Sequence, residues 1–221
     1  MTKFKALLFD LDGTLIDSEH FHYRVWNEIL AESAVQLQYS DFLKNFAGVP
    51  LPGNAKRLKE LYEIESPLEA LILQKEELTN ERLKTSTIEL MPYVEETLDF
   101  FFSKGIAMAL VTASKRTDVD EVFRKNGLNK YFNLLVTRSD VTKSKPDPES
   151  YNLAVQGIGF QKSECLVFED TVNGLMAAKN AELTCFAIQG DEESHAKLAS
   201  ADQIFTDFRA AQAYIIANEL I

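Results

Sequence analysis

Basic side chains, cysteines and long apolar runs are all scarce in this sequence of 221 residues. It carries 23 Lys and Arg against 34 Asp and Glu, so its formal net charge is −11 at pH 7. A charge of this sign and size argues against nucleic acid and anionic membrane surfaces as partners. Any anionic substrate would need a local basic pocket, because the field of the whole protein repels it.

The two cysteines, Cys165 and Cys185, each lie inside an apolar run. This setting is typical of buried, reduced thiols and argues against a disulfide or a metal-binding pair. No apolar segment approaches the length that spans a membrane, and the N-terminal residues show no signal-peptide pattern. We therefore expect a cytoplasmic protein, with a monomer as the default.

Residues 17–87 lack a convincing strand and predict helices. Apolar residues recur there at helical spacing, and the helices are expected from Asp17 or Ser18 onward, at 41–47, at 54–63 and at 66–85. The composition of residues 48–53 indicates a loop. Ser66-Pro67-Leu68-Glu69 has the pattern of a capping box at the start of the last helix.

From residue 93 the pattern alternates between helices and short apolar strands. Strands are expected at 106–111, 134–137, 165–168, 184–188 and 203–205, after a first strand at 4–9. Strands that are apolar throughout, with helices between them, are typical of a parallel sheet covered on both faces. The sequence therefore predicts a doubly wound, Rossmann-like α/β core of residues 1–16 and 88–221. An all-helical domain of residues 17–87 is inserted into it.

Two glycines are expected to end helices of the core. The helix over about 115–126 has Gly127 at its C-terminal cap, and the helix over 148–156, capped by Asp147, should stop at Gly157.

Polar side chains stand where several predicted strands end, which is where open parallel sheets bind ligands. The first strand ends at Asp10 and Asp12, whose side chains point to the same side of an extended chain. Two carboxylates crowded there are costly unless a cation or ligand neutralises them. The other strands lead to polar residues at 112–114, 145 and 169–170. The pattern indicates a metal site, a catalytic pair, or both.

These residue types suit phosphoryl transfer. Mg²⁺ prefers oxygen ligands, and Asp10 and Asp170 are the natural side-chain candidates. The hydroxyl of Thr112 and the two amides that follow it precede a helix, where N–H groups and the helix dipole hold an anion. Lys145 adds positive charge against the phosphoryl oxygens. One carboxylate can act as nucleophile while a second moves the proton.

Four segments carry a resemblance to a known family: Asp10-Leu11-Asp12-Gly13-Thr14, Leu110-Val111-Thr112-Ala113-Ser114, Lys145-Pro146-Asp147-Pro148 and Phe168-Glu169-Asp170. In this order and spacing they resemble the four motifs of the haloacid dehalogenase-like (HAD) superfamily. The resemblance covers essentially the whole chain, including a helical cap inserted after the first motif.

The resemblance implies a catalytic role for four residues. Asp10 corresponds to the nucleophile and Asp12 to the general acid and base, while Thr112 binds the transferring phosphoryl group and Lys145 stabilises its charge. Dehalogenase branches and phosphonate-cleaving members lack an acid at the position of Asp12. Its presence favours phosphate esters as substrates.

The resemblance also implies Mg²⁺ as the cofactor and a set of substrate contacts. The expected metal ligands are Asp10, the backbone carbonyl of Asp12, Asp170 and Glu169. The expected substrate contacts are Thr112, Ala113, Ser114, Lys115 and Lys145. Lys115 and its neighbour Arg116 are equally compatible with contacting the distal part of the substrate and with lying in solvent.

His22 has two interpretations. It lies beside Val25 and Trp26 on the apolar side of its helix, which favours a packed or hydrogen-bonded structural histidine. The related β-phosphoglucomutase group has a histidine at a similar place. The alternative is therefore that His22 reaches the substrate site from the cap and contacts Asp12 when the cap closes. Trp26 itself is expected in the core of the helical domain.

The sequence thus predicts a magnesium-dependent phosphatase that acts on a small phosphorylated metabolite, with a sugar phosphate favoured, through an aspartyl-phosphate intermediate. One alternative is a mutase of the β-phosphoglucomutase type. Such mutases carry a basic residue in a cap loop, whereas residues 48–53 have no charge. The other alternative is a non-catalytic, receiver-like phosphate-binding module, but receivers are shorter and need neither the cap nor Asp12.

Overall fold

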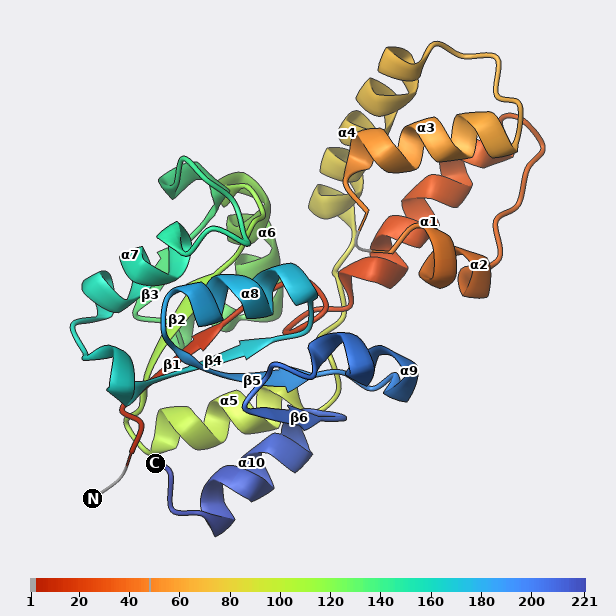
Figure 1. Cartoon of the computed structure of the whole chain (residues 1–221). Coiled ribbons are helices and arrows are strands. Elements are labelled where there is room, and N and C mark those ends of the chain that lie inside the picture. Colours follow the sequence, from red (N-terminus) through yellow and green to blue (C-terminus); the bar gives the residue numbers. More distant parts are fainter. Residues whose placement is uncertain (1–2, 48) are drawn as a thin grey trace. The chain divides into compact units, whose positions relative to one another are not determined.

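The computed structural model describes residues 3–47 and 49–221, which fall into two compact units (Figure 1). The sheet unit comprises Met1–Ile16 and Glu89–Ile221, and the helical unit comprises Asp17–Ile88. No helix within the described ranges is both long and apolar enough to cross a membrane.

The sheet unit is built on six parallel strands in the order β3-β2-β1-β4-β5-β6. They are β1 (Ala6–Phe9), β2 (Ala107–Val111), β3 (Leu134–Val136), β4 (Cys165–Glu169), β5 (Thr184–Ile188) and β6 (Gln203–Phe205). The direction of winding reverses between β1 and β4, so the carboxyl ends of these two strands flank the crevice where such sheets bind ligands. The predicted doubly wound α/β class is confirmed.

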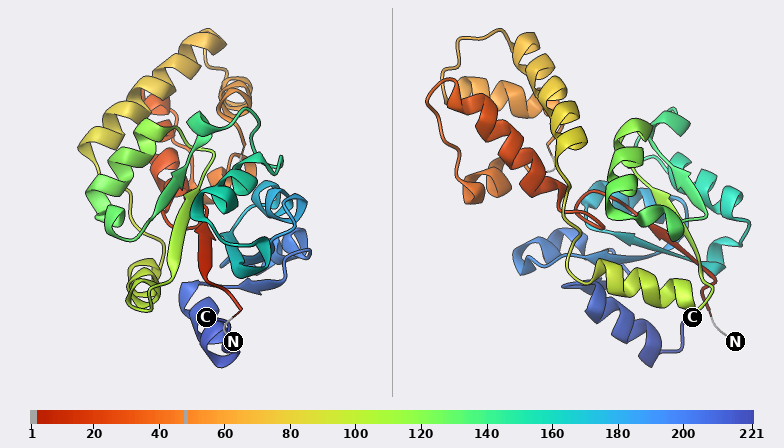
Figure 2. Two further views of the ribbon diagram at one scale, coloured as in Figure 1. Left: turned by 90° about the vertical axis from the view of Figure 1, so that its left-hand side faces the viewer. Right: turned by 180° about the vertical axis from the view of Figure 1, so that it is seen from behind.

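Helices cover both faces of this sheet, as Figures 1 and 2 show. The helices are α5 (Val94–Ser103), α6 (Arg116–Asn126), α7 (Glu149–Ile158), α8 (Val172–Asn180), the short α9 (Glu192–His195) and α10 (Phe208–Ala217). One face carries α7 and α8, and the other carries α5 and α10 (Figure 1). Both faces of the central strands are therefore buried, which is why the strands are largely apolar.

The two faces of the sheet have different cores. Ala6 and Leu8 of β1 belong to a largely aliphatic cluster. Phe9, on the opposite face, stacks on Phe168 of β4 with ring centroids 5.0 Å apart. Phe208 of α10 completes this aromatic layer at 6.0 Å from Phe9 and 5.4 Å from Phe168. These layers fix the strand ends at which the polar residues stand.

The helical unit contains α1 (Ser18–Ala31), α2 (Tyr39–Asn45), α3 (Leu51–Leu61) and α4 (Leu68–Thr85). The side chain of Asp17 caps α1 by accepting a hydrogen bond from the amide of His20 at 3.0 Å, as predicted. The predicted loop at 48–53 is wrong beyond Pro50, because α3 already begins at Leu51 with a proline in its first turn. Gly48 lies outside the described residues.

Two predicted helix signals are also corrected. The capping box at residues 66–69 does not form: Pro67 occupies the N-cap of α4, and no side-chain cap bond is made. Gly157 does not stop α7, which runs to Ile158 with Gly159 as its C-cap, where φ is +80°. Gly157 is instead a point of close approach, since a Cβ there would meet the side chain of Leu134 at 2.7 Å. Gly127 does cap α6 in the left-handed conformation.

Candidate active site

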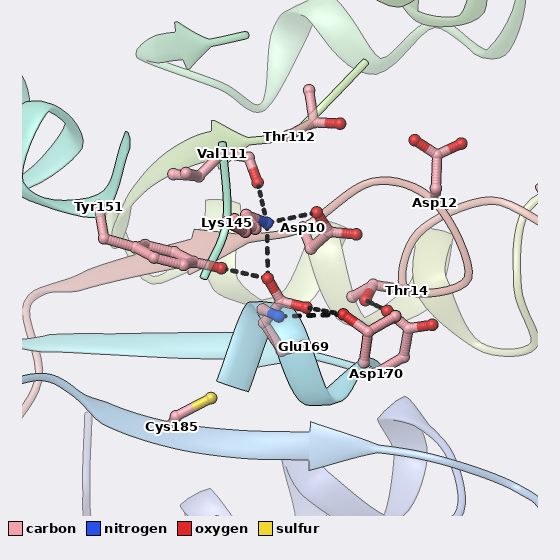
Figure 3. Close-up of polar contacts among 12 residues, drawn as sticks. Asp10, Asp12, Thr14, Val111, Thr112, Lys145, Tyr151, Glu169, Asp170 and Cys185 are labelled. Carbon is pink, nitrogen blue, oxygen red and sulfur yellow. Dashed lines mark hydrogen bonds and ion pairs between the residues drawn. The ribbon is translucent and has the colours of Figure 1, made fainter. Parts of the chain in front are cut away.

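The polar residues at the strand ends meet at one edge of the sheet (Figure 3). The parallel register sets Phe9 opposite both Leu110 and Phe168, so Asp10 follows β1 beside the ends of β2 and β4. The amide of Asp10 continues the ladder by donating to the carbonyl of Phe168 at 3.0 Å. Asp10 is therefore held by backbone pairing, with only 7% of its surface exposed.

Lys145 binds three acceptors at the centre of this edge. Its Nζ donates to Oδ1 of Asp10 at 2.6 Å, to Oε1 of Glu169 at 2.6 Å and to the carbonyl of Val111 at 2.8 Å. An ammonium group has three N–H donors, and all three are engaged. Burial disfavours its charge, but Asp10 and Glu169 outweigh burial and hold the pKa of Lys145 above its usual value.

Glu169 is enclosed between two elements and is 1% exposed. Its Oε1 accepts a second hydrogen bond, from the phenol of Tyr151 at 2.6 Å. On the other side lies Gly174, in the first turn of α8, where a Cβ would collide with the Glu169 carboxyl group. Burial and then the charges of Glu169 and Asp10 raise the pKa of Tyr151 well above 10.0, so the phenol remains a donor.

Asp170 follows Glu169 in the sequence, and two residues of the first motif, Gly13 and Thr14, contact it. Thr14, which is fully buried, donates its hydroxyl to Oδ1 of Asp170 at 3.0 Å. The backbone of Gly13 also approaches it, since a Cβ there would collide with Oδ2 of Asp170. The positive φ of Gly13, +78°, adds a second reason for glycine at this position.

The donor set fits a hard divalent cation such as Mg²⁺. Ligand oxygens of Asp10, Glu169 and Asp170 lie within 4.8 Å of one another. Burial raises the pKa of Asp10 from 3.8 to about 8; Lys145 opposes this rise, and Glu169 and Asp12 add to it. The ammonium of Lys145 alone does not compensate the carboxylates, and a cation beside them would favour the ionised form of Asp10.

The end of β2 supplies hydroxyl and amide groups. Thr112 is buried, and its Oγ1 accepts a hydrogen bond from the amide of Ser114 at 3.0 Å. The hydroxyl of Ser114 donates to Oδ2 of Asp12 at 2.5 Å, which joins the first and second motifs. Ala113 is exposed between them. The predicted residues of these two motifs are thus brought together.

The next two residues, at positions 115 and 116, are exposed, unlike the buried residues of this cluster. Lys115 is exposed and forms the N-cap of α6. Arg116 is also exposed and pairs with Asp120 one helical turn away at 2.9 Å. The pairing supports the solvated interpretation of Arg116, and a substrate contact of Lys115 stays a prediction.

His22 belongs to the helical unit and contacts a buried lysine. Nδ1 of His22 lies 3.3 Å from Nζ of Lys75 in α4, and Lys75 also donates to Thr79 at 2.9 Å. Trp26 is 2% exposed, as expected of a core residue, and its ring lies 5.4 Å from the same ammonium. A hydrogen-bonded role for His22 is thus observed, and its contact with Asp12 stays a prediction.

The contacts that three polar residues make at these sites were not anticipated from the sequence: those of Thr14, Lys75 and Tyr151. The apolar spacing of α7 marks position 151 as buried, but it does not reveal which group a buried phenol would meet. Lys75 follows Gln74 and precedes two glutamates, a context that indicates a solvent-facing lysine.

Known proteins share this fold. A family model described as haloacid dehalogenase-like hydrolase matches residues 7–188, from β1 to the end of β5. The chain belongs to the haloacid dehalogenase-like hydrolase family.

Relatives place the chain within that family. It is 33% identical over 177 residues to a phosphorylated carbohydrates phosphatase of Thermotoga maritima, covering 80% of this chain and 81% of the relative. A haloacid dehalogenase family hydrolase of Deinococcus radiodurans, solved with phosphate and sodium, superposes with a TM-score of 0.84 at 26% identity, covering 100% and 99% of the two chains. A putative β-phosphoglucomutase of Thermotoga maritima gives 0.81 at 26% identity, covering 98% and 100%. The chain is a phosphomonoester hydrolase of the phosphatase and β-phosphoglucomutase-like branch.

Proposed function

We propose that this phosphatase hydrolyses a small phosphorylated metabolite, with a sugar phosphate as the favoured substrate, and that it depends on Mg²⁺. One observation carries the proposal: Lys145 joins Asp10 to Glu169 at a buried strand edge where Asp12 and Asp170 also stand. The phosphorylated carbohydrates named for the Thermotoga relative support the substrate class.

In the first step, Asp10 attacks the phosphorus atom. Lys145 engages Oδ1, so Oδ2 is the oxygen that forms the new bond. The phosphorus–oxygen bond of the ester breaks as the Oδ2–phosphorus bond forms, and the leaving oxygen takes the proton of Asp12. The hydroxyl of Ser114, bonded to Oδ2 of Asp12, orients this acid.

In the second step, the aspartyl phosphate is hydrolysed. The Asp12 carboxylate takes a proton from a water molecule, whose oxygen then attacks phosphorus. The bond between phosphorus and Oδ2 of Asp10 breaks, which releases inorganic phosphate and restores both aspartates. Lys145 remains beside the phosphoryl oxygens and offsets their charge in both steps.

When bound, Mg²⁺ would supply further positive charge against the phosphoryl oxygens, held by Asp10, Glu169, Asp170 and the backbone carbonyl of Asp12. Thr112, with the amides of Ala113 and Ser114, would bind the phosphoryl group.

The helical unit acts in this proposal as a cap. It would open to admit substrate and close to exclude water during the first transfer. The chain passes between the two units at Ile16–Asp17 and at Ile88–Glu89, so hinges are expected near residues 14–18 and 86–92. His22 would then be a candidate for a contact on the substrate side.

A mutase of the β-phosphoglucomutase type is the second candidate, favoured by the likeness to the putative Thermotoga enzyme. A mutase must hold a second phosphate, which needs a basic group in the helical unit. Residues 48–53, the segment in which such mutases carry a basic residue, have no charge. This absence of charge favours hydrolysis.

The test is phosphate release from a panel of sugar phosphates in the presence of Mg²⁺. Turnover without glucose 1,6-bisphosphate, lost on chelation of the metal, is the expected result. Turnover that requires the bisphosphate would favour the mutase. Absence of release from every ester in the panel would contradict the proposal.

A further inference from the structure

Tyr151 is a buried polar group that the proposed reaction does not use. It lies in the first turn of α7 with none of its surface exposed. Figure 3 shows its phenol pointing toward Glu169, to whose Oε1 it donates at 2.6 Å. Its ring centroid also lies 5.0 Å from Nζ of Lys145. One side chain thus contacts two members of the catalytic cluster and is hidden from solvent.

The hydroxyl of Tyr151 helps to place Glu169. The oxygen that accepts from Tyr151 is the one that accepts from Lys145 at 2.6 Å. With Gly174 closing the opposite side, the carboxylate is held between α7 and α8. The other oxygen of Glu169 has a weak partner, the hydroxyl of Thr171 at 3.4 Å. Tyr151 and Lys145 therefore provide the two short bonds that fix the carboxylate.

The position of Glu169 in turn sets that of Lys145. Because all three donors of the ammonium are engaged, movement of one acceptor changes its distance to the other two. Without the phenol, a buried carboxylate keeps a single strong donor and draws that ammonium toward itself. Lys145 would then lie further from Oδ1 of Asp10, and so further from the residue whose Oδ2 takes the phosphoryl group.

We propose that Tyr151 is a positioning residue for phosphoryl transfer, which holds Glu169 so that Lys145 stays on Asp10. This role rests on the proposed function and refines it. Tyr151 acts through Glu169 and Lys145, and none of its own surface is exposed. Its loss should therefore slow transfer and leave substrate binding nearly unchanged.

Tyr131 provides a matched control in the same unit. It is 3% exposed, and its hydroxyl donates to Asp99 at 2.6 Å, the same length as the Tyr151 bond. Tyr131 precedes β3 and so lies at the amino edge of the sheet, opposite the catalytic edge. Tyr131→Phe removes a hydrogen bond of the same length, here to an exposed carboxylate, without touching the site.

The experiment compares Tyr151→Phe with Tyr131→Phe in the full chain, using p-nitrophenyl phosphate and the best sugar phosphate of the panel. A hydrogen bond to a charged partner corresponds to about a 10- to 100-fold effect. We expect kcat of Tyr151→Phe to fall by that factor, with KM changed less than about threefold. Tyr131→Phe should keep kcat within about twofold, although both variants lose thermal stability.

Equal kcat values for the two variants would overturn the positioning role, as would a Tyr151→Phe defect confined to KM. Tyr151→Leu, which also lacks the hydroxyl, replaces Tyr151→Phe if that variant does not fold, and the same loss of kcat is required of it. A wild-type protein that hydrolyses no ester would overturn the proposed function itself. Normal wild-type turnover with an unaffected Tyr151→Phe overturns only the role of Tyr151.

Discussion

Lys75 should make the stability of the protein depend on pH in a way that one substitution removes. The residue is 3% exposed, and the contacts described for it, with Thr79, His22 and Trp26, include no carboxylate. Burial lowers the pKa of Lys75 from 10.5 to about 7. The gap between these two values corresponds to about 5 kcal/mol, an upper bound on the cost of burying the charge.

The direction of the pH dependence follows from whether the folded or the unfolded state binds the proton of Lys75 more tightly. Below pH 7 the ammonium is charged in both states, and the folded protein bears the full cost of burial. Between pH 7 and 10.5 the folded state loses the proton while the unfolded state keeps it, so stability rises by about 1.4 kcal/mol per pH unit. Lys75→Met removes both the cost and the slope.

Urea unfolding of wild type and Lys75→Met at pH 6, 7.5 and 9 measures this effect. The variant should be more stable at pH 6, and its advantage should shrink by about 2 to 3 kcal/mol by pH 9. Lys84→Met, at an exposed position of the same helix, should show no such trend. Parallel pH profiles for wild type and Lys75→Met would show that Lys75 does not bind its proton more weakly in the folded state.

Three further predictions concern the catalytic edge. Asp12→Asn should lose about 10²- to 10⁴-fold in kcat with sugar phosphates but less with p-nitrophenyl phosphate, whose leaving group needs little protonation; equal losses would contradict the acid role. Gly174→Ala should displace Glu169 and cost roughly 1 to 3 kcal/mol of stability in thermal unfolding, whereas Gly190→Ala, whose Cβ meets its nearest neighbour at 3.5 Å, should be close to neutral. Addition of Mg²⁺ should raise the melting temperature of wild type, and Asp170→Asn should reduce that increase, as measured by differential scanning calorimetry; an unchanged increase would argue against the metal site.

The sheet and its polar edge could be predicted from the sequence because both depend on short-range patterns. A strand such as β1, apolar at every position, can only be buried on both faces, and parallel strands present their carboxyl ends at one edge. Asp10, Asp12 and Lys145 could therefore be assigned to one site before their distances were known. The family resemblance then supplied their expected roles.

Features that depend on long-range packing could not be predicted. Gly157 looks like a helix terminator in sequence, but it is required by the approach of α7 to Leu134 on β3. The phenol of Tyr151 and the carboxylate of Glu169 meet only after α7 packs on the sheet. Lys75 looks solvated among charged neighbours, and only the packing of α1 on α4 buries it against Trp26.

In the proposed mechanism Asp10 carries the phosphoryl group, and trapping the intermediate shows directly whether it does. Wild-type protein is mixed with substrate and Mg²⁺, quenched in acid within milliseconds, digested and analysed by mass spectrometry. We predict a phosphorylated peptide whose modified residue is Asp10, absent in Asp10→Asn, which should also show no turnover. An Asp10→Asn variant that still releases phosphate, or a phosphoryl group trapped on another residue, would contradict the account.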